Sequence, residues 1–117
     1  RKVLGGGMRQ VGYLAAAANY AIDNNINDLN YDHKKAKELE SVLNDLVYVD
    51  RVEPVSTNII IFSLKKTLDE DKFIELLIKN NIRLIKLGKG KIRIVTHRDY
   101  TQNQHEFTIN ILKKLKF

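Results

Sequence analysis

The sequence predicts an α+β domain in which a small antiparallel sheet carries its helices on one face, in the order αα-ββ-α-ββ-α. Two observations distinguish the halves of the chain: apolar residues recur at helical spacing up to residue 45, and β-branched runs follow it. A third observation is the short connection Gly88-Lys89-Gly90 between two of these runs, which favours an antiparallel hairpin.

Two helices are expected first. Residues 8–24 contain four consecutive alanines, which are strong helix formers and allow another element to approach closely. The Asp- and Asn-rich residues 23–28 interrupt this helix. A second helix is predicted over residues 29–45, with an apolar stripe formed by Ala36, Leu39, Val42, Leu43 and Leu46.

The pattern then changes to strands. Residues 47–49 predict a strand, and residues 51–56, which contain the only proline, predict an irregular edge. Residues 58–63 form a continuous β-branched and aromatic run, which predicts a strand covered on both faces.

The remaining elements are a helix, a hairpin and a final helix. Thr67 has the capping-box spacing to Glu70 and is expected to cap a helix that ends near Asn80. Residues 82–87 and 91–95 predict the two strands of the hairpin, and residues 101–116 predict the last helix. The side chains expected to be buried in the two helices are Phe73, Ile74, Leu77, Ile78, Phe107, Ile111, Leu112 and Leu115.

Composition limits the classes of function. The chain has 117 residues and no cysteine, so it forms no disulfide and no thiolate metal site. No apolar run has a bilayer-spanning length, and we expect a cytoplasmic protein with no membrane partner. The net charge of +6 raises nucleic acid as a partner, but the basic stretches 86–91 and 113–116 lack interleaved aromatic residues, which makes solvated faces the better interpretation. His33 and His105 are interpreted as surface residues, and no metal site is expected.

The glycine segment Gly5-Gly6-Gly7 precedes the first helix. A helix start presents unpaired N–H groups and the positive end of the helix dipole. The positive charge of Arg9 is therefore electrostatically unfavourable there, and its presence needs a further explanation. An anion or a carboxylate that binds Arg9 at the helix start would provide that explanation.

Residues 1–12, read as R-K-V-L-G-G-G-M-R-Q-V-G, resemble a segment of threonine aldolases, which are pyridoxal-phosphate enzymes of the aspartate-aminotransferase fold. Residues 92–97, read as I-R-I-V-T-H, resemble the I-R-x-V-T-H strand of the same family. The two motifs stand in the family's order, and the resemblance covers essentially the whole chain.

The resemblance implies a lyase that cleaves a β-hydroxy-α-amino acid, threonine or allo-threonine, to glycine and an aldehyde. The lysine that attaches the cofactor in this family lies upstream of the glycine segment. We therefore expect a C-terminal fragment that holds no catalytic residue and is inactive alone. Residues 1–27 would bridge to a missing large domain, and residues 28–117 would form the small C-terminal domain of a fold-type I enzyme.

The resemblance also assigns roles to individual residues. Lys2 and Arg9 match positions beside the cofactor, in their own or a neighbouring subunit, and the family implies a homo-oligomer, either a tetramer or a dimer. Strand alternation places Arg93 opposite Ile92 and Ile94, which by itself indicates an exposed arginine on the solvent side of the sheet. The resemblance instead implies that Arg93 binds the substrate α-carboxylate.

Alternatives remain for His97 and for the function. His97 either supports the arginine strand or caps a turn. The chain could also belong to another fold-type I pyridoxal-phosphate lyase, such as a β-eliminating lyase, or be a small basic α+β module that binds nucleic acid.

Overall fold

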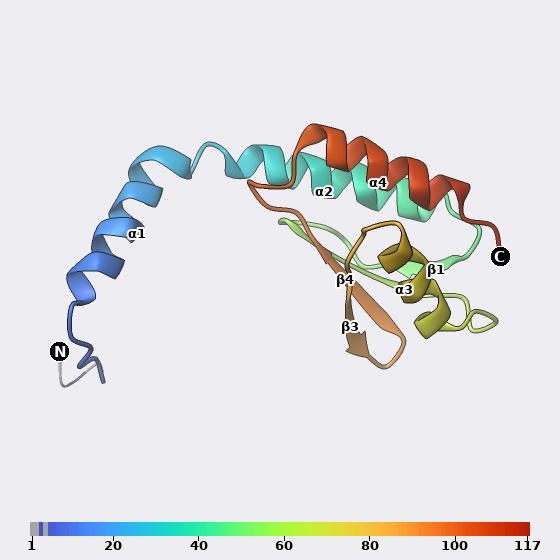
Figure 1. Cartoon of the computed structure of the whole chain (residues 1–117), viewed down its shortest axis with the longest axis horizontal. Coiled ribbons are helices and arrows are strands. Elements are labelled where there is room, and N and C mark those ends of the chain that lie inside the picture. The colour runs from blue at the N-terminus through green and yellow to red at the C-terminus, as the bar shows by residue number, and fades with distance from the viewer. Residues whose placement is uncertain (1–2, 4) are drawn as a thin grey trace.

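The computed structural model describes residue 3 and residues 5–117. Within these residues the predicted order αα-ββ-α-ββ-α is confirmed (Figure 1). The helices are α1 (Val11–Asn25), α2 (Leu29–Asn44), α3 (Glu70–Lys79) and α4 (Gln102–Lys114), and the strands are β1 (Val49–Val52), β2 (Ile59–Leu64), β3 (Ile85–Gly88) and β4 (Lys91–Val95).

The four described strands form one antiparallel sheet in the order β1-β2-β4-β3. The predicted hairpin joins β3 to β4 through Gly88-Lys89-Gly90, and all three of these residues have positive φ. Two glycines at such positions avoid the steric cost that a Cβ would add. The strand β4 therefore lies inside the sheet, with β2 on one side and β3 on the other.

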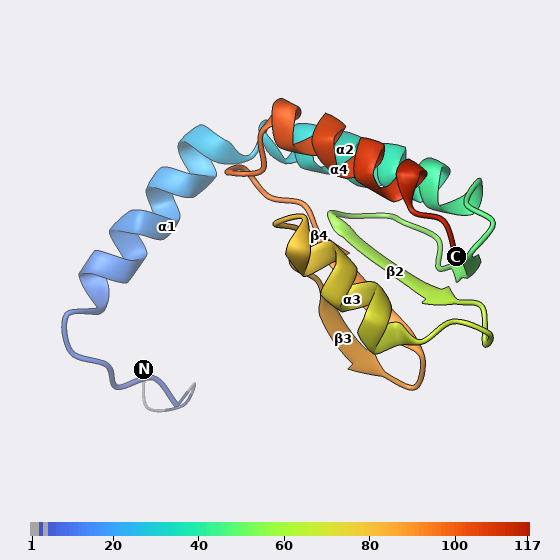
Figure 2. The same ribbon diagram turned by 45° about the vertical axis from the view of Figure 1, so that its right-hand side comes forward.

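One face of the sheet carries the core. Phe62 of β2 and Ile92 of β4 are almost fully buried, and they share one apolar cluster with Leu39 of α2, Phe73 of α3 and Leu112 of α4. Figure 2 shows α2 and α4 side by side along this face, with α3 covering its other part. The prediction that the helices lie on one face of the sheet is confirmed.

The expectation that the strand over residues 58–63 is covered on both faces is wrong for the described chain. Burial alternates along β2, where Ile60, Phe62 and Leu64 are buried while Ile59 is 41% exposed. A continuous apolar run does not reveal whether a second layer exists, because apolar residues are also tolerated on an open face. The residues of β2 and β4 that point away from the helices lie on what is called here the open face: Ile59, Ile61, Ser63, Lys91, Arg93 and Val95.

Several element boundaries also differ from the prediction. The first strand begins at Val49 because residues 46–48 form a turn, in which the Val49 N–H donates to the carbonyl of Leu46 at 3.1 Å. The helix α3 is capped by Asp69, whose carboxylate accepts from the N–H groups of Asp71 at 2.9 Å and Lys72 at 3.3 Å, and not by Thr67.

The helix α1 begins at Val11, three residues later than expected, because Gln10 has a left-handed backbone with φ of 49°. It projects from the rest of the chain, as Figures 1 and 2 both show, and none of its residues is buried. The longest dimension of the molecule, 53 Å, includes this projection. No helix of the described residues has the length and apolarity that crossing a membrane requires.

Candidate functional site

Arg93 lies at the centre of the open face. On β4 it pairs with Ile61 of β2 and with Ile85 of β3, so its side chain stands between two apolar neighbours on the same face. The residue is half-buried, and its Nε is shielded from solvent without a hydrogen-bond partner among the described residues. A shielded guanidinium N–H without an acceptor is unfavourable, which makes Arg93 a site that an anionic ligand would stabilise.

Lys91 of this face and Arg51 of the neighbouring strand β1 share one acidic partner, Glu53. Its carboxylate accepts from Lys91 at 3.1 Å and lies 3.4 Å from Nη2 of Arg51. The hydrogen bond from Lys91 is the main reason that the pKa of the Glu53 carboxyl lies below its usual value, and the charges of Arg51 and Lys91 act in the same direction. Among the described residues no comparable acidic partner lies at Arg93.

Lys86 points to the helix-covered side of the sheet. It pairs with Ile92 across β4, and its ammonium lies 2.8 Å from the Asp71 carboxylate and 3.6 Å from that of Glu70, both on α3. The hydrogen bond to Asp71 is the main cause that raises the pKa of Lys86. Lys86 therefore stays protonated and does not contribute to the open face.

The end of β4 leads into an exposed loop. His97 has a 60% exposed side chain, and its Nδ1 lies 4.0 Å from the carboxylate of Asp99. It borders a hollow of about 220 Å³ that lies between the end of β4, the segment before β3 and α4, and that is also lined by Arg83, Tyr100 and Phe107. No hydrogen bond between described residues joins His97 to Arg93.

The structure does not bring together Arg9 and Arg93, the two predicted site residues that it describes. Arg9 is exposed and precedes α1, and Figures 1 and 2 place this end of α1 far from the sheet that carries Arg93. Lys2 lies outside the described residues. Any site shared by the glycine segment and Arg93 would therefore need a neighbouring part of the protein or another subunit.

The prediction that His105 is a surface residue is wrong. Its side chain is 1% exposed, and its Nε2 lies 2.8 Å from a carboxylate oxygen of Glu38 on α2. The ring of Tyr100 packs edge-on against it at 5.7 Å. The helical spacing 105, 108, 112 could have indicated this burial, because Thr108 and Leu112 share the buried side of α4.

No group of three metal-ligating side chains gathers in the part of the chain that the structure describes. The chemistry of the described site is thus that of a cation on a partly apolar strand face. Such an arrangement suits a small carboxylate, because arginine offers paired N–H donors that match the two carboxylate oxygens.

Comparison with known proteins agrees with this architecture. The model of the beta-eliminating lyase family matches residues 1–67. Low-specificity L-threonine aldolase 1 of Arabidopsis thaliana is 38% identical over an alignment of 117 positions, which covers 97% of this chain and 33% of that relative. The probable low-specificity L-threonine aldolase 2 of the same plant is 34% identical over 98% of this chain and 33% of its own length. The chain thus spans about a third of the length of the curated relatives it matches.

Solved structures show the same fold at low identity. A C-DES variant with glycine covalently linked to its PLP cofactor has a TM-score of 0.68 at 17% identity, over 90% of this chain and 28% of that one. A decarboxylase from Sulfurospirillum multivorans has a TM-score of 0.56 at 18% identity, over 68% of this chain and 23% of that one. Because the family model covers more than half of the chain, the chain belongs to the beta-eliminating lyase family.

Proposed function

We propose that this chain is the C-terminal part of a pyridoxal-phosphate lyase of the threonine aldolase type, which cleaves a β-hydroxy-α-amino acid such as threonine to glycine and an aldehyde. The names of the relatives that align with almost the whole chain support this reaction. The observation that carries the proposal is Arg93, a half-buried cation that has no acidic partner among the described residues.

The role proposed for Arg93 is to bind the α-carboxylate of the amino acid. Arg93 lies on β4, whose backbone is held between β2 and β3. The flanking side chains of Ile61 and Ile85 restrict the side chain of Arg93. A held guanidinium fork binds both oxygens of a carboxylate and thereby orients the rest of the substrate.

The sheet offers Arg93 for the substrate carboxylate, but its ion-paired Lys86 does not suit the attachment of the cofactor. When bound, pyridoxal phosphate supplies the electron sink for cleavage of the Cα–Cβ bond. Attachment needs a lysine that can lose its proton, whereas the Asp71 carboxylate holds the ammonium of Lys86 and raises its pKa. We place the attachment lysine outside this chain, with Lys2 and Arg9 near the cofactor of the same or a neighbouring subunit.

The proposed domain organisation follows from the same assignment. Residues 1–27 would connect to the remainder of a longer enzyme, and residues 28–117 would form its small C-terminal domain. The exposed apolar side chains of α1, which include Tyr13 at 80% and Leu14 at 56% exposure, support a partner surface for this helix. The chain alone would then be inactive, and the complete enzyme would be a cytoplasmic homo-oligomer.

A β-elimination of an amino acid is the second candidate, because the matching family model is described as beta-eliminating lyase. The two reactions give different products: aldol cleavage of threonine releases glycine and acetaldehyde, whereas elimination releases a keto acid and ammonia. Product analysis of the full-length enzyme with threonine distinguishes them. Nucleic-acid binding has less support, since the residues of β2 and β4 on the open face are not aromatic.

Replacement of Arg93 by lysine in the full-length enzyme tests the proposal. Lysine keeps the charge but loses the bidentate fork, and hydrogen bonds to charged groups contribute roughly 1.5–3 kcal/mol. We expect kcat/KM for threonine to fall by about one to two orders of magnitude, with cofactor absorbance unchanged.

Arg51→Lys is the matched control, because Arg51 is an exposed arginine that already has Glu53 as its partner. It should leave kcat/KM for threonine close to that of the parent. If Arg93→Lys behaved like this control, Arg93 would be an ordinary surface arginine and the proposed binding role would be wrong.

A further inference from the structure

The loop that follows β4 is fastened to the first turns of α2. The buried hydroxyl of Thr96 donates to the carbonyl of Asp32 at 2.8 Å. The ammonium of Lys35 donates to the carbonyl of Tyr100 and also lies 5.5 Å from the centre of that tyrosine ring. The loop is therefore a fixed continuation of the strand that carries Arg93.

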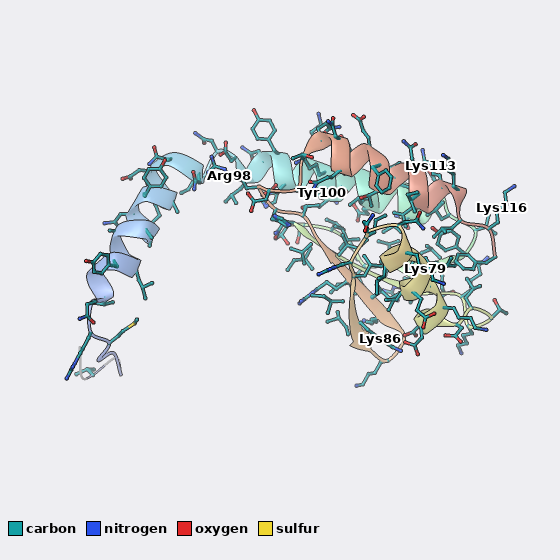
Figure 3. All side chains as sticks on the ribbon, viewed as in Figure 1. Lys79, Lys86, Arg98, Tyr100, Lys113 and Lys116 are labelled. Carbon is teal, nitrogen blue, oxygen red and sulfur yellow. The ribbon has the colours of Figure 1, made fainter. Side chains whose placement is uncertain are left out.

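From this loop Arg98 reaches the bend between α1 and α2, as Figure 3 shows. Its Nη1 donates to the side-chain oxygen of Asn25 at 2.5 Å, and its Nη2 lies 3.7 Å from a carboxylate oxygen of Asp28. Asn25 is the last residue of α1, and Asp28 immediately precedes α2. One guanidinium thus contacts both sides of the bend.

The charges at the bend suit this contact. The last turn of α1 contains no basic residue, so the partial negative charge at that helix end has no cation of its own. Arg98 supplies the cation, and Asp28 places its carboxylate near the partially positive start of α2. The guanidinium therefore interacts favourably with a helix end as well as with two side chains.

Apart from the backbone turns of the bend, Arg98 makes the only polar contacts that hold the angle of α1 in the described chain. Among the described residues, every hydrogen bond or ion pair that joins α1 or the bend to residues beyond α2 comes from Arg98. The helix buries none of its residues, and the bend itself consists of short backbone turns such as the one from the Asp28 N–H to the Asn25 carbonyl at 3.1 Å.

We propose that Arg98 is a positioning residue that latches the bend at residues 26–28 to the loop after β4. Through this latch it sets where Arg93 stands relative to the surface that α1 contacts. The second part rests on the proposed function, in which α1 joins the remainder of the enzyme and Arg93 binds the substrate carboxylate. The first part concerns only the described chain and is tested separately.

Distance measurement between spin labels tests the latch in the 117-residue chain itself. Because the chain has no cysteine, Ala17→Cys on α1 and Lys113→Cys on α4 provide two unique labelling positions, both exposed. We expect Arg98→Ala to broaden the distance distribution between them. Combining Arg98→Asp with Asp28→Arg should narrow it again, since the swap restores opposite charges across the bend.

Arg83→Ala is the control, because Arg83 is an exposed arginine that precedes β3, and among the described residues the side-chain contacts of the bend come from Arg98 and not from Arg83. It should leave the distribution as narrow as in the parent. A distribution that Arg98→Ala does not broaden would overturn the latch.

Kinetics of the full-length enzyme test the positioning role. An exposed ion pair contributes little free energy, so its loss should have a small effect. We expect Arg98→Ala to raise KM for threonine about two- to fivefold, with a smaller change in kcat. The charge-swapped pair should recover most of the affinity, which a merely destabilised variant would not do.

The outcomes separate this inference from the proposed function. An unchanged KM in Arg98→Ala, in an enzyme whose Arg93→Lys variant does lose substrate binding, would overturn the positioning role. If neither variant changed the kinetics, the proposed function would be contradicted and the positioning role would fall with it, while the distance measurement would still decide whether the latch exists.

Discussion

Glu40 fastens the segment between β1 and β2 to α2. Its carboxylate accepts from the backbone N–H of Val55 at 2.7 Å and from the ammonium of Lys37 at 2.8 Å, and its side chain is only 18% exposed. These two hydrogen bonds, the one from Lys37 first, lower the pKa of the Glu40 carboxyl. A carboxyl whose pKa is lowered by folding stabilises the protein in its ionised form.

Glu40→Gln should therefore reduce the free energy of unfolding by about 1 kcal/mol at pH 7, because the amide has one oxygen left to accept from the Val55 N–H and no charge to attract Lys37. The contribution of the carboxylate is present above its unfolded-state pKa, near 4.3, and is lost as the pH falls through the lower folded-state value. Urea denaturation of the two proteins at pH 7 and pH 3 measures the difference, which should shrink at pH 3.

Glu75→Gln, at an exposed position of α3, serves as the comparison for Glu40→Gln and should change the stability little at either pH. An equal loss of stability for Glu40→Gln at pH 7 and pH 3 would show that shape, and not charge, matters at this position.

The placement of a single residue is predictable from the sequence where a local rule decides on which face its side chain lies. Arg93 was placed opposite Ile92 by strand alternation, and the register confirms that it lies on the face away from the helices. The spacing along α4 could indicate that His105 is buried, but not that it pairs with Glu38, which is distant in sequence and becomes its neighbour only when α2 packs beside α4. The role of Arg93 stays a prediction.

At the scale of elements, α4 shows what a complete cap contributes. Thr101 accepts from the N–H of Gln104 at 3.3 Å through its hydroxyl, and the Gln104 side chain accepts from the N–H of Thr101 at 2.8 Å. This reciprocal capping box satisfies two N–H groups at the helix start. It also fixes where the chain turns after the loop that carries Arg98.

Thr101→Ala removes the hydroxyl acceptor and should lower the free energy of unfolding by about 1 kcal/mol, measured by thermal or urea denaturation. Thr101→Ser keeps an equivalent acceptor and should restore most of the loss. An alanine variant as stable as the serine variant would contradict the assigned cap.

The start of α3 shows why cap prediction from spacing is ambiguous. Thr67 has the capping-box spacing to Glu70, which favours it over Asp69 as the cap. It lies instead in a turn closed by the hydrogen bond from the Leu68 N–H to the Lys65 carbonyl at 2.9 Å. Leu68 packs against the core, and this contact delays the helix until Asp69 caps it. Tertiary packing decided between two locally acceptable caps.

At the scale of the whole molecule, α1 is the element whose surroundings the sequence did not specify. The alanine-rich run predicted close approach by another element, but α1 buries no residue in the described chain. Its exposed apolar residues are Val11, Tyr13, Leu14, Tyr20 and Ile22. A surface of this kind favours association with another protein surface.

The isolated chain should therefore self-associate through α1 as its concentration rises. Sedimentation velocity should show a weight-average coefficient that increases up to high micromolar concentration, and Leu14→Glu should suppress the increase. Val47→Glu is the control, because Val47 is 82% exposed but lies outside α1. A clean monomer at all concentrations would contradict the assignment of α1 as a contact surface.

The most direct test of the account asks whether Arg93 recognises the charge of the substrate carboxylate. The full-length enzyme and its Arg93→Gln variant are each assayed with threonine and with threoninamide, which lacks that charge. The parent should prefer threonine in kcat/KM by about one to two orders of magnitude, the kinetic equivalent of a charge-assisted hydrogen bond. The account predicts that Arg93→Gln reduces this preference to near unity. An undiminished preference for threonine in Arg93→Gln would show that another group binds the carboxylate, and would contradict the account.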